Sequence, residues 1–177
     1  MNPYSDFSVP WFDAFLLWLS ATELRAFFYR FEDFDWLFVF AHVASAAVLL
    51  GSILIVDLRI IGVMREINLR KLAVLALPWS IGGAIIALLS GTVLLLFDPI
   101  AVGVHTYFLP KMGLILLGLL NALAFHHFTN LEAAETPTTR ARFAGALSIA
   151  LWAGVFLCAT LNGTERISSS NHAELGR

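Results

Sequence analysis

An apolar run over residues 34–62 is long enough to cross a lipid bilayer, and it constrains the chain more than any other feature. His42 lies near one end of this run, and Asp57-Leu58-Arg59 lies near the other. At about 1.5 Å of rise per residue, the fifteen residues from His42 to Asp57 extend roughly 22 Å along a helix. A hydrocarbon layer is about 30 Å thick. We therefore expect these polar groups near opposite faces of the membrane.

Composition extends this expectation to the whole chain. Of the 177 residues, 59% are hydrophobic and 14% are charged, so lipid is the expected solvent for much of the surface. The net charge of −2 leaves no basic stripe and argues against nucleic acid as a partner. The single cysteine, Cys158, lies in an apolar run. It excludes a disulfide or a cysteine-based metal site within one chain, and a structural core thiol is expected.

The apolar pattern predicts an all-α integral membrane protein, with a four-helix transmembrane bundle over residues 34–161. The expected spans are about 36–63, 73–97, 107–128 and 143–161. Residues 1–33 are expected to form an interfacial segment, and residues 162–177 a polar C-terminal tail that frays. No signal-peptide pattern precedes the first span, which we expect to act as an uncleaved targeting signal. No internal repeat indicates an inverted-repeat transporter.

Residues 9–31 are rich in aromatic side chains, but four charged residues interrupt them, which is too many for a span. We interpret this segment as one or two amphipathic helices lying in the membrane interface. Trp11, Phe15, Trp18 and Leu19 are then expected to face the lipid. A packed cap over the bundle is the alternative.

Basic residues near the helix ends indicate an orientation. They gather around the loops at Arg70 and Arg140, which the positive-inside rule places in the cytoplasm. Both termini are then expected on the periplasmic side of a bacterial inner membrane.

Small residues recur at helical spacing in the first two spans, which predicts close helix packing. They are Ala44, Ala47 and Gly51 in the first span, and Gly83, Ala87 and Gly91 in the second. Asn121 in the third span is expected to hydrogen-bond a neighbouring helix rather than to bind a ligand.

The third span repeats the polar spacing of the first, because Lys111 and His126 are also fifteen residues apart. The first and third spans run in the same direction. With the helices in register, His42 and Lys111 share an outer level, and Asp57 and His126 share an inner one. Ionisable groups within spans usually face the bundle interior.

Two readings of the outer level are open. Either His42 hydrogen-bonds to a hydroxyl or a carbonyl group inside the bundle, or it is an axial ligand of a b-type haem. Lys111 would pair with a haem propionate, or it extends to the interface as long cationic side chains do. His105, just before the third span, is either a second axial ligand or a solvated loop residue.

The inner level is equally open. Asp57 and Arg59 are two residues apart and cannot face each other on one helix. Asp57 is expected to point inward, in a structural ion pair or in a proton relay, while Arg59 reaches the cytoplasmic headgroups. His126 is too far from His42 to bind the same iron. It either pairs with Asp57 or joins His127 in a second site.

Motif residues are distributed over nearly the whole chain. They are His42, Gly51, Asp57-Leu58-Arg59, Gly62, Leu77-Pro78-Trp79, Ser90-Gly91, Phe108, Lys111-Met112, Asn121 and Trp152. This set resembles a bacterial four-helix membrane family known as a domain of unknown function. More distantly, the first-span histidine and the third-span lysine are similar to those of HemJ-type protoporphyrinogen oxidases and copper-resistance D-like membrane proteins. The HemJ-type resemblance implies haem b, carried onto His42 and Lys111.

Three functional hypotheses follow, and no hydrolase, phosphate-loop or dinucleotide motif adds a fourth. The first is an inner-membrane subunit that binds haem b and transfers electrons between the quinone pool and a periplasmic redox partner. The second is a cofactor-free accessory or assembly subunit, and the third is a small metal or solute transporter that depends on Asp57. Expected partners are the lipid bilayer, other subunits of a membrane complex and a quinone. Whether the chain is itself catalytic stays open.

Overall fold

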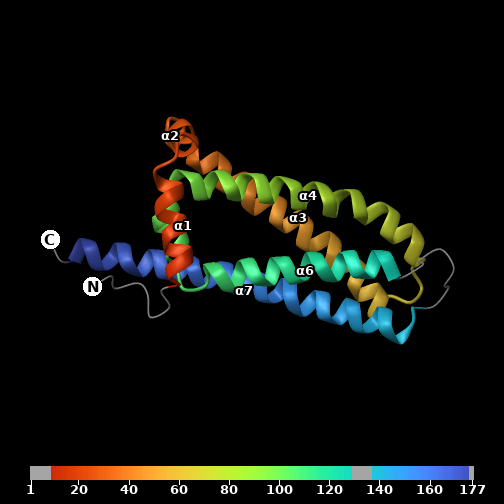
Figure 1. Cartoon of the computed structure of the whole chain (residues 1–177). Helices are drawn as coiled ribbons and strands as arrows, with labels where there is room; N and C mark the ends of the chain where they lie inside the picture. The colour runs from red at the N-terminus through yellow and green to blue at the C-terminus, as the bar shows by residue number, and fades with distance from the viewer. Residues whose placement is uncertain (1–8, 129–136, 176–177) are drawn as a thin grey trace.

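The computed structural model describes residues 9–128 and 137–175 (Figure 1). Over these ranges the secondary structure is helical, without strands, which confirms the predicted all-α four-helix membrane bundle. The elements are α1 (Pro10–Ser20), α2 (Glu23–Tyr29), η1 (Glu32–Phe34), α3 (Asp35–Ile61), α4 (Leu69–Phe97), α5 (Pro99–Gly103), α6 (Phe108–Phe128) and α7 (Thr139–Leu175).

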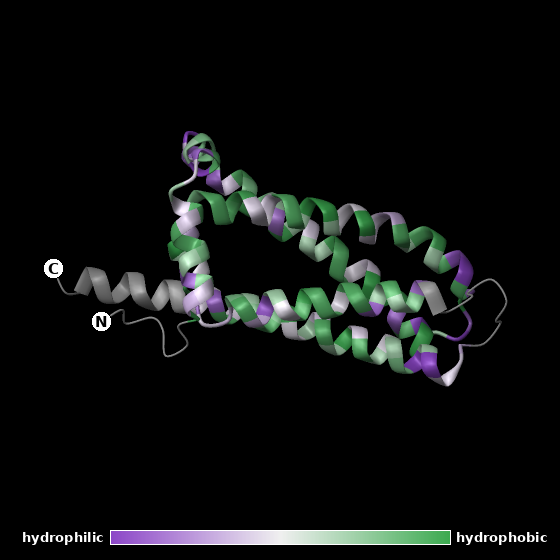
Figure 2. Ribbon diagram, viewed as in Figure 1, coloured by the Kyte–Doolittle hydropathy of each residue, from purple (hydrophilic) through white to green (hydrophobic). Residues whose placement is uncertain are grey.

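Four helical stretches of the described chain are long and apolar enough to cross a membrane. They are Glu32–Ile61, Leu69–Phe97, Phe108–His126 and Thr139–Thr164. Successive spans run in opposite directions, so α3 and α6 both begin at the end of the bundle where α1 lies (Figure 1). We call this the α1 end, and the opposite end, where α3 turns into α4, the Arg59 end. Figure 2 shows hydrophobic residues along the spans, with hydrophilic ones gathered in α2 and at the Arg59 end.

The spans pack in a defined order, with α4 on α3, α3 on α7, and α7 on α6. Large apolar side chains remain exposed on the outer surface of the bundle, including Leu75, Leu89, Leu123 and Phe156. In a bilayer these side chains contact lipid, so the apolar surface is satisfied without a large protein core.

The predicted small-residue face of the second span packs directly on α3. A Cβ at Gly83 would lie 2.8 Å from the carbonyl oxygen of Ser45 and 2.9 Å from the backbone nitrogen of Leu49. Such distances are shorter than any normal contact, so glycine sets the approach of these two backbones. The first-span stripe does not serve this purpose, because Gly51 is exposed and has nothing within 4 Å of its would-be Cβ. Instead Ser52 joins the pair, accepting a 2.8 Å hydrogen bond from Ser80.

Helix α1 crosses the end of the bundle (Figure 1), and one of its faces is buried. Phe12, Leu16 and Leu19 lie on that buried stripe, whereas Trp11, Phe15 and Trp18 are exposed, as predicted. The expectation that Leu19 faces lipid is wrong, because Leu19 continues the i, i+4, i+7 series of Phe12. The segment is therefore an amphipathic helix that also caps the bundle, combining the two sequence-based alternatives.

The connection from α1 to α3 is locally stabilised. The hydroxyl of Thr22 caps α2 by accepting a 3.3 Å hydrogen bond from the backbone N–H of Arg25. The guanidinium of Arg25 lies 4.5 Å from the ring centroid of Tyr29, within cation–π range. A hydrogen bond with Glu32, together with its charge, raises the pKa of the Tyr29 hydroxyl above its usual range.

Two helices begin four residues earlier than the hydrophobic pattern predicts. The side chain of Asn68 accepts from the N–H of Lys71 at 3.0 Å, and Thr138 accepts from the N–H of Ala141 at 3.2 Å. These N-caps satisfy free backbone donors, so α4 and α7 start within polar sequence.

Helix α7 also continues further than expected. It reaches Leu175 and extends past α1 at its C-terminal end, whereas a fraying tail was expected from residue 162 (Figure 1). No proline or glycine occurs between Thr164 and Leu175, so nothing in this stretch interrupts the helix.

Candidate functional site

His42 is held between α3 and α4 by a polar contact to the backbone of α4. Its Nδ1 lies 2.9 Å from the carbonyl oxygen of Ala87 and 3.4 Å from Oγ of Ser90. A carbonyl oxygen can only accept, so Nδ1 carries the hydrogen and donates it. In the neutral imidazole the lone pair then belongs to Nε2. This is the arrangement by which proteins orient a histidine that binds metal through its other nitrogen.

The local sequence of α4 makes room for this ring. A Cβ at Gly91 would lie 2.9 Å from Cε1 of His42, so any larger residue there would displace the imidazole. The hydroxyl of Ser90 donates to the carbonyl oxygen of Ile86 at 2.6 Å, one turn earlier in its own helix. Its oxygen therefore faces the ring as a second polar neighbour. The Ser90-Gly91 pair thus shapes the surface on which His42 rests.

Lys111 lies in the first turn of α6, at the same end of the bundle as His42. Its ammonium is 5.3 Å from the ring centroid of Phe108 and is close enough to His42 for the two groups to interact electrostatically. Cys158 of α7 is buried, as predicted. The two residues that were expected to share the outer level are thus both near the α1 end, in the first part of α3 and of α6.

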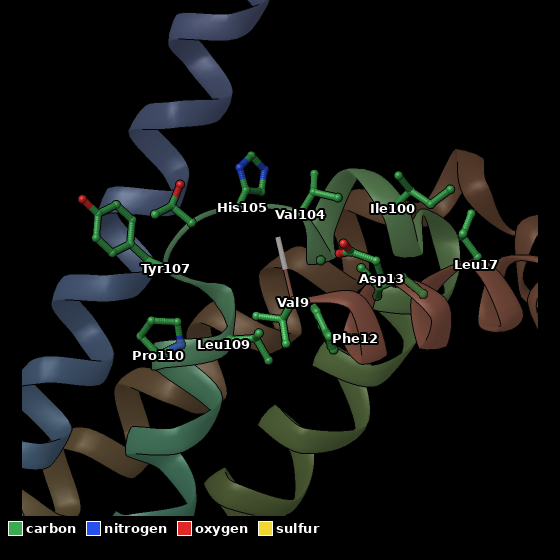
Figure 3. A pocket seen from close by; sticks show the side chains of 13 residues that line it. Val9, Phe12, Asp13, Leu17, Ile100, Val104, His105, Tyr107, Leu109 and Pro110 are labelled. Carbon is green, nitrogen blue, oxygen red and sulfur yellow. The ribbon is translucent and has the colours of Figure 1, made fainter. Parts of the chain in front are cut away.

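His105 lies elsewhere, in the connection between α5 and α6. It lines a cavity of about 700 Å³ beneath α1, together with Asp13, Phe12 and Leu109 (Figure 3). His42, by contrast, contacts Ala87 and Ser90 between α3 and α4. His42 and His105 therefore have different neighbours, and whether His105 supplies a second axial ligand stays a prediction.

Asp57 is buried where α3 packs against α7, with 7% of its surface exposed. The hydroxyl of Ser148 in α7 hydrogen-bonds to the carboxyl group, whereas the buried Oδ2 finds no partner among the described residues. A Cβ at Gly145 would lie 3.5 Å from the carbonyl oxygen of Asp57, so the two helices are close at this level. Asp57 points inward as predicted, and the partner shown for it is a hydroxyl.

The other inner-level residues do not join Asp57. His126 is exposed near the end of α6, and the side chain of His127 lies outside the part that the structure describes. The neighbouring Phe125 packs against the buried cluster of Ile60, Leu69 and Ala141. Asn121 donates a 3.1 Å hydrogen bond to the carbonyl oxygen of Ala144, which confirms its predicted role between helices.

Arg59 does not extend to the headgroups as expected. It is buried, and its Nε donates a hydrogen bond to the carbonyl oxygen of Ile67 in the turn between α3 and α4. Gly62 ends α3 in the left-handed conformation, with φ of 103°, so the chain reverses direction at once. This sharp reversal brings the Ile67 carbonyl within reach of Arg59.

The donor set at the outer level fits a haem held by one protein nitrogen. His42 offers an oriented imidazole with its Nε2 lone pair, and Lys111 offers a cation suited to a propionate. A compact mononuclear metal site is a poorer fit, since the described residues contain no cluster of three or more His, Cys, Asp or Glu side chains.

Comparisons with protein-family models, with curated proteins and with solved structures find no match. Fold and site define a four-span membrane protein in which the Ala87 carbonyl orients His42, and Lys111 lies near the same end of the bundle. Sequence patterns could not reveal the Ala87 carbonyl, because every residue carries one. They could have flagged Ser90 and Ser148, which are small polar residues inside otherwise apolar spans.

Proposed function

We propose that this chain is a haem b-binding electron-transfer subunit of a bacterial inner membrane complex, linking a membrane quinone to a periplasmic redox partner. The observation that carries the proposal is the 2.9 Å hydrogen bond from Nδ1 of His42 to the Ala87 carbonyl oxygen. That bond fixes the tautomer and the ring orientation, and it leaves Nε2 as the ligand atom. Bound there, the haem would supply one-electron transfer.

The chain's own residues would position the group and tune its charge. His42 would bind the iron through Nε2, while the backbone of Ala87 holds the ring against rotation. Lys111 would pair with a carboxylate of the porphyrin edge, and its contact with Phe108 keeps the ammonium near the end of the bundle. In this proposal the α1 end faces the periplasm, because the basic loops at Arg70 and Arg140 favour the cytoplasm.

Haem content of the purified protein tests the proposal. We expect about one b-type haem per chain by pyridine haemochrome assay. We also expect loss of that haem in His42→Ala but not in His126→Ala, a matched substitution at the Arg59 end. Haem-free wild-type protein, folded and expressed with ample haem, would contradict the proposal.

One observation favours the second candidate, a cofactor-free accessory subunit. The contact of His42 with Ala87 also holds α3 and α4 together, alongside the Gly83 approach and the bond between Ser52 and Ser80. In that case His42 stabilises the helix pair and nothing more. A colourless protein that co-purifies with membrane partners, and in which His42→Ala lowers thermal stability, would favour this candidate.

A further inference from the structure

Asp57 is a buried carboxyl group inside an apolar span, and the proposed haem site does not use it. It lies where α3 packs against α7, with 7% of its surface exposed, and its buried Oδ2 has no hydrogen-bond partner among the described residues. The hydroxyl of Ser148 in α7 hydrogen-bonds to the same carboxyl group. An isolated carboxylate is very costly in such surroundings. Asp57 therefore needs either a neighbouring cation or a proton.

Helix α3 itself provides no cation that faces Asp57. Arg59 is two residues away, and side chains at this spacing do not face each other on a helix. The guanidinium of Arg59 instead donates to the carbonyl oxygen of Ile67, in the turn that follows α3. His42 is fifteen residues away, which is about 22 Å along the helix axis. Neither residue neutralises the carboxyl group.

The helices around α3 carry no charge at the depth of Asp57. Charged residues and histidines are absent from the sequence over residues 72–97 of α4, 112–125 of α6 and 143–164 of α7. The basic residues at the Arg59 end occupy exposed positions, and they are Arg65, Arg70, Lys71, His126, Arg140 and Arg142. On α7, Arg142 precedes Ser148 by six residues, or about 9 Å along the axis. The packing thus leaves a proton or a bound metal ion to neutralise Asp57.

A metal ion fits this position less well than a proton does. The carboxyl group and the Ser148 hydroxyl are the side-chain oxygens described here, whereas hard cations in proteins take about six oxygen ligands. The described residues also contain no group of three or more His, Cys, Asp or Glu side chains that could hold a metal. A proton requires one oxygen only, and the hydroxyl of Ser148 can donate to the neutral acid or accept from it.

We propose that Asp57 is a proton-binding site, in which the carboxyl group holds an exchangeable proton at neutral pH beside the Ser148 hydroxyl. Asp57 precedes Ile61, the last residue of α3, by four residues, which is about 6 Å along the axis. Water at the Arg59 end is therefore close enough for the proton to exchange. The first residue of α3, Asp35, is about 33 Å from Asp57 on the same scale.

Infrared spectroscopy at pH 7 tests the assignment, in maltoside micelles because this detergent has no carbonyl group. A protonated carboxyl group has a C=O stretching band that a carboxylate lacks. We expect such a band in the wild type, its shift to lower wavenumber in heavy water, and its loss in Asp57→Asn. In Ser148→Ala the band should move to higher wavenumber, because a hydrogen bond to the acid is lost. Asp35→Asn, the same change at an exposed position of α3, should leave the band unchanged.

Four results would overturn the assignment. Absence of the band from folded wild-type protein would show an ionised carboxylate, and a band retained in Asp57→Asn would belong to another group. A band that does not shift in heavy water would show a trapped proton. Loss of the band when sodium chloride replaces choline chloride would assign a metal ion to the site. The spectrum of His42→Ala separates this inference from the proposed function, since we expect the band to persist in protein without haem.

Discussion

Gly91 lies against the imidazole of His42, so closely that a Cβ at position 91 would stand 2.9 Å from Cε1 of the ring. The same ring donates to Ala87, one helical turn earlier in α4. The orientation of His42 therefore depends on two backbone features of α4, an accepting carbonyl and a missing side chain.

Gly91→Ala should weaken haem binding although residue 91 contributes no ligand. The added methyl group forces the ring away from the Ala87 carbonyl oxygen, and loss of such an orienting bond lowers affinity about 10- to 100-fold. Haem titration of the apoprotein, followed in the Soret band, measures the effect. Gly82→Ala is the matched control, because a Cβ at Gly82 meets nothing within 4 Å. Equal affinities for the two variants would contradict the orienting role of Ala87.

Gly83→Ala should destabilise the pairing of α3 with α4. Its Cβ would lie 2.8 Å from a backbone oxygen of Ser45, and a backbone atom cannot rotate away as a side chain can. We expect the free energy of unfolding to fall by about 1–3 kcal/mol, the usual cost of overpacking. Reversible unfolding in mixed detergent micelles measures this change. Gly113→Ala in α6, with nothing within 4 Å of its Cβ, should unfold like the wild type.

The spans were predictable because hydrophobic length alone identifies a membrane helix. The ends of the spans were less predictable, because Asn68 and Thr138 cap α4 and α7 within polar sequence. The spacing of polar groups along the axis of each span was also predictable, because it follows from helical rise. The rotation of each helix about its own axis was not predictable, because helices that are apolar all round carry little signal of which face points inward. Hence the depth of Asp57 was foreseen, but its partner Ser148 was not.

The surroundings of two residues, Leu19 and Arg59, were predicted wrongly for related reasons. Leu19 is apolar like its lipid-facing neighbours, so only its spacing from Phe12 and Leu16 indicates the buried face. Arg59 looked like a headgroup contact because its depth is close to the helix end. Its burial follows from the tight reversal at Gly62, which presents the Ile67 carbonyl to it.

Ser148→Ala should destabilise the bundle through Asp57. Removing the hydroxyl leaves the buried carboxyl group without its described donor, which costs about 1–3 kcal/mol of unfolding free energy. Unfolding in mixed micelles measures the change. Ser20→Ala is the control, because the Ser20 hydroxyl makes a solvent-exposed hydrogen bond of 2.7 Å within its own helix, and we expect a change within about 0.5 kcal/mol. A double variant with Asp57→Leu should recover much of the loss, since no buried carboxyl group then remains unpaired.

Gly103→Ala should loosen α1 from the end of the bundle. A Cβ at position 103 would lie 2.5 Å from both terminal methyl carbons of Leu16, which is fully buried. Limited proteolysis in nanodiscs should cut the region of α1 faster than in the wild type. Shortening the opposing side chain, in Gly103→Ala with Leu16→Ala, should restore part of the protection. Unchanged cleavage in the single variant would mean that α1 does not depend on this contact.

The visible spectrum of His42→Gly, with and without added imidazole, tests the central claim most directly. The account predicts a reduced-minus-oxidised b-type spectrum in the wild type, its loss in the variant, and its return when free imidazole occupies the vacated space. Return of the spectrum would identify the His42 nitrogen as the ligand, since imidazole restores a ligand but not a covalent link between helices. A b-type spectrum that persists in His42→Gly without imidazole would contradict the account, and so would its absence from haem-supplied wild-type protein.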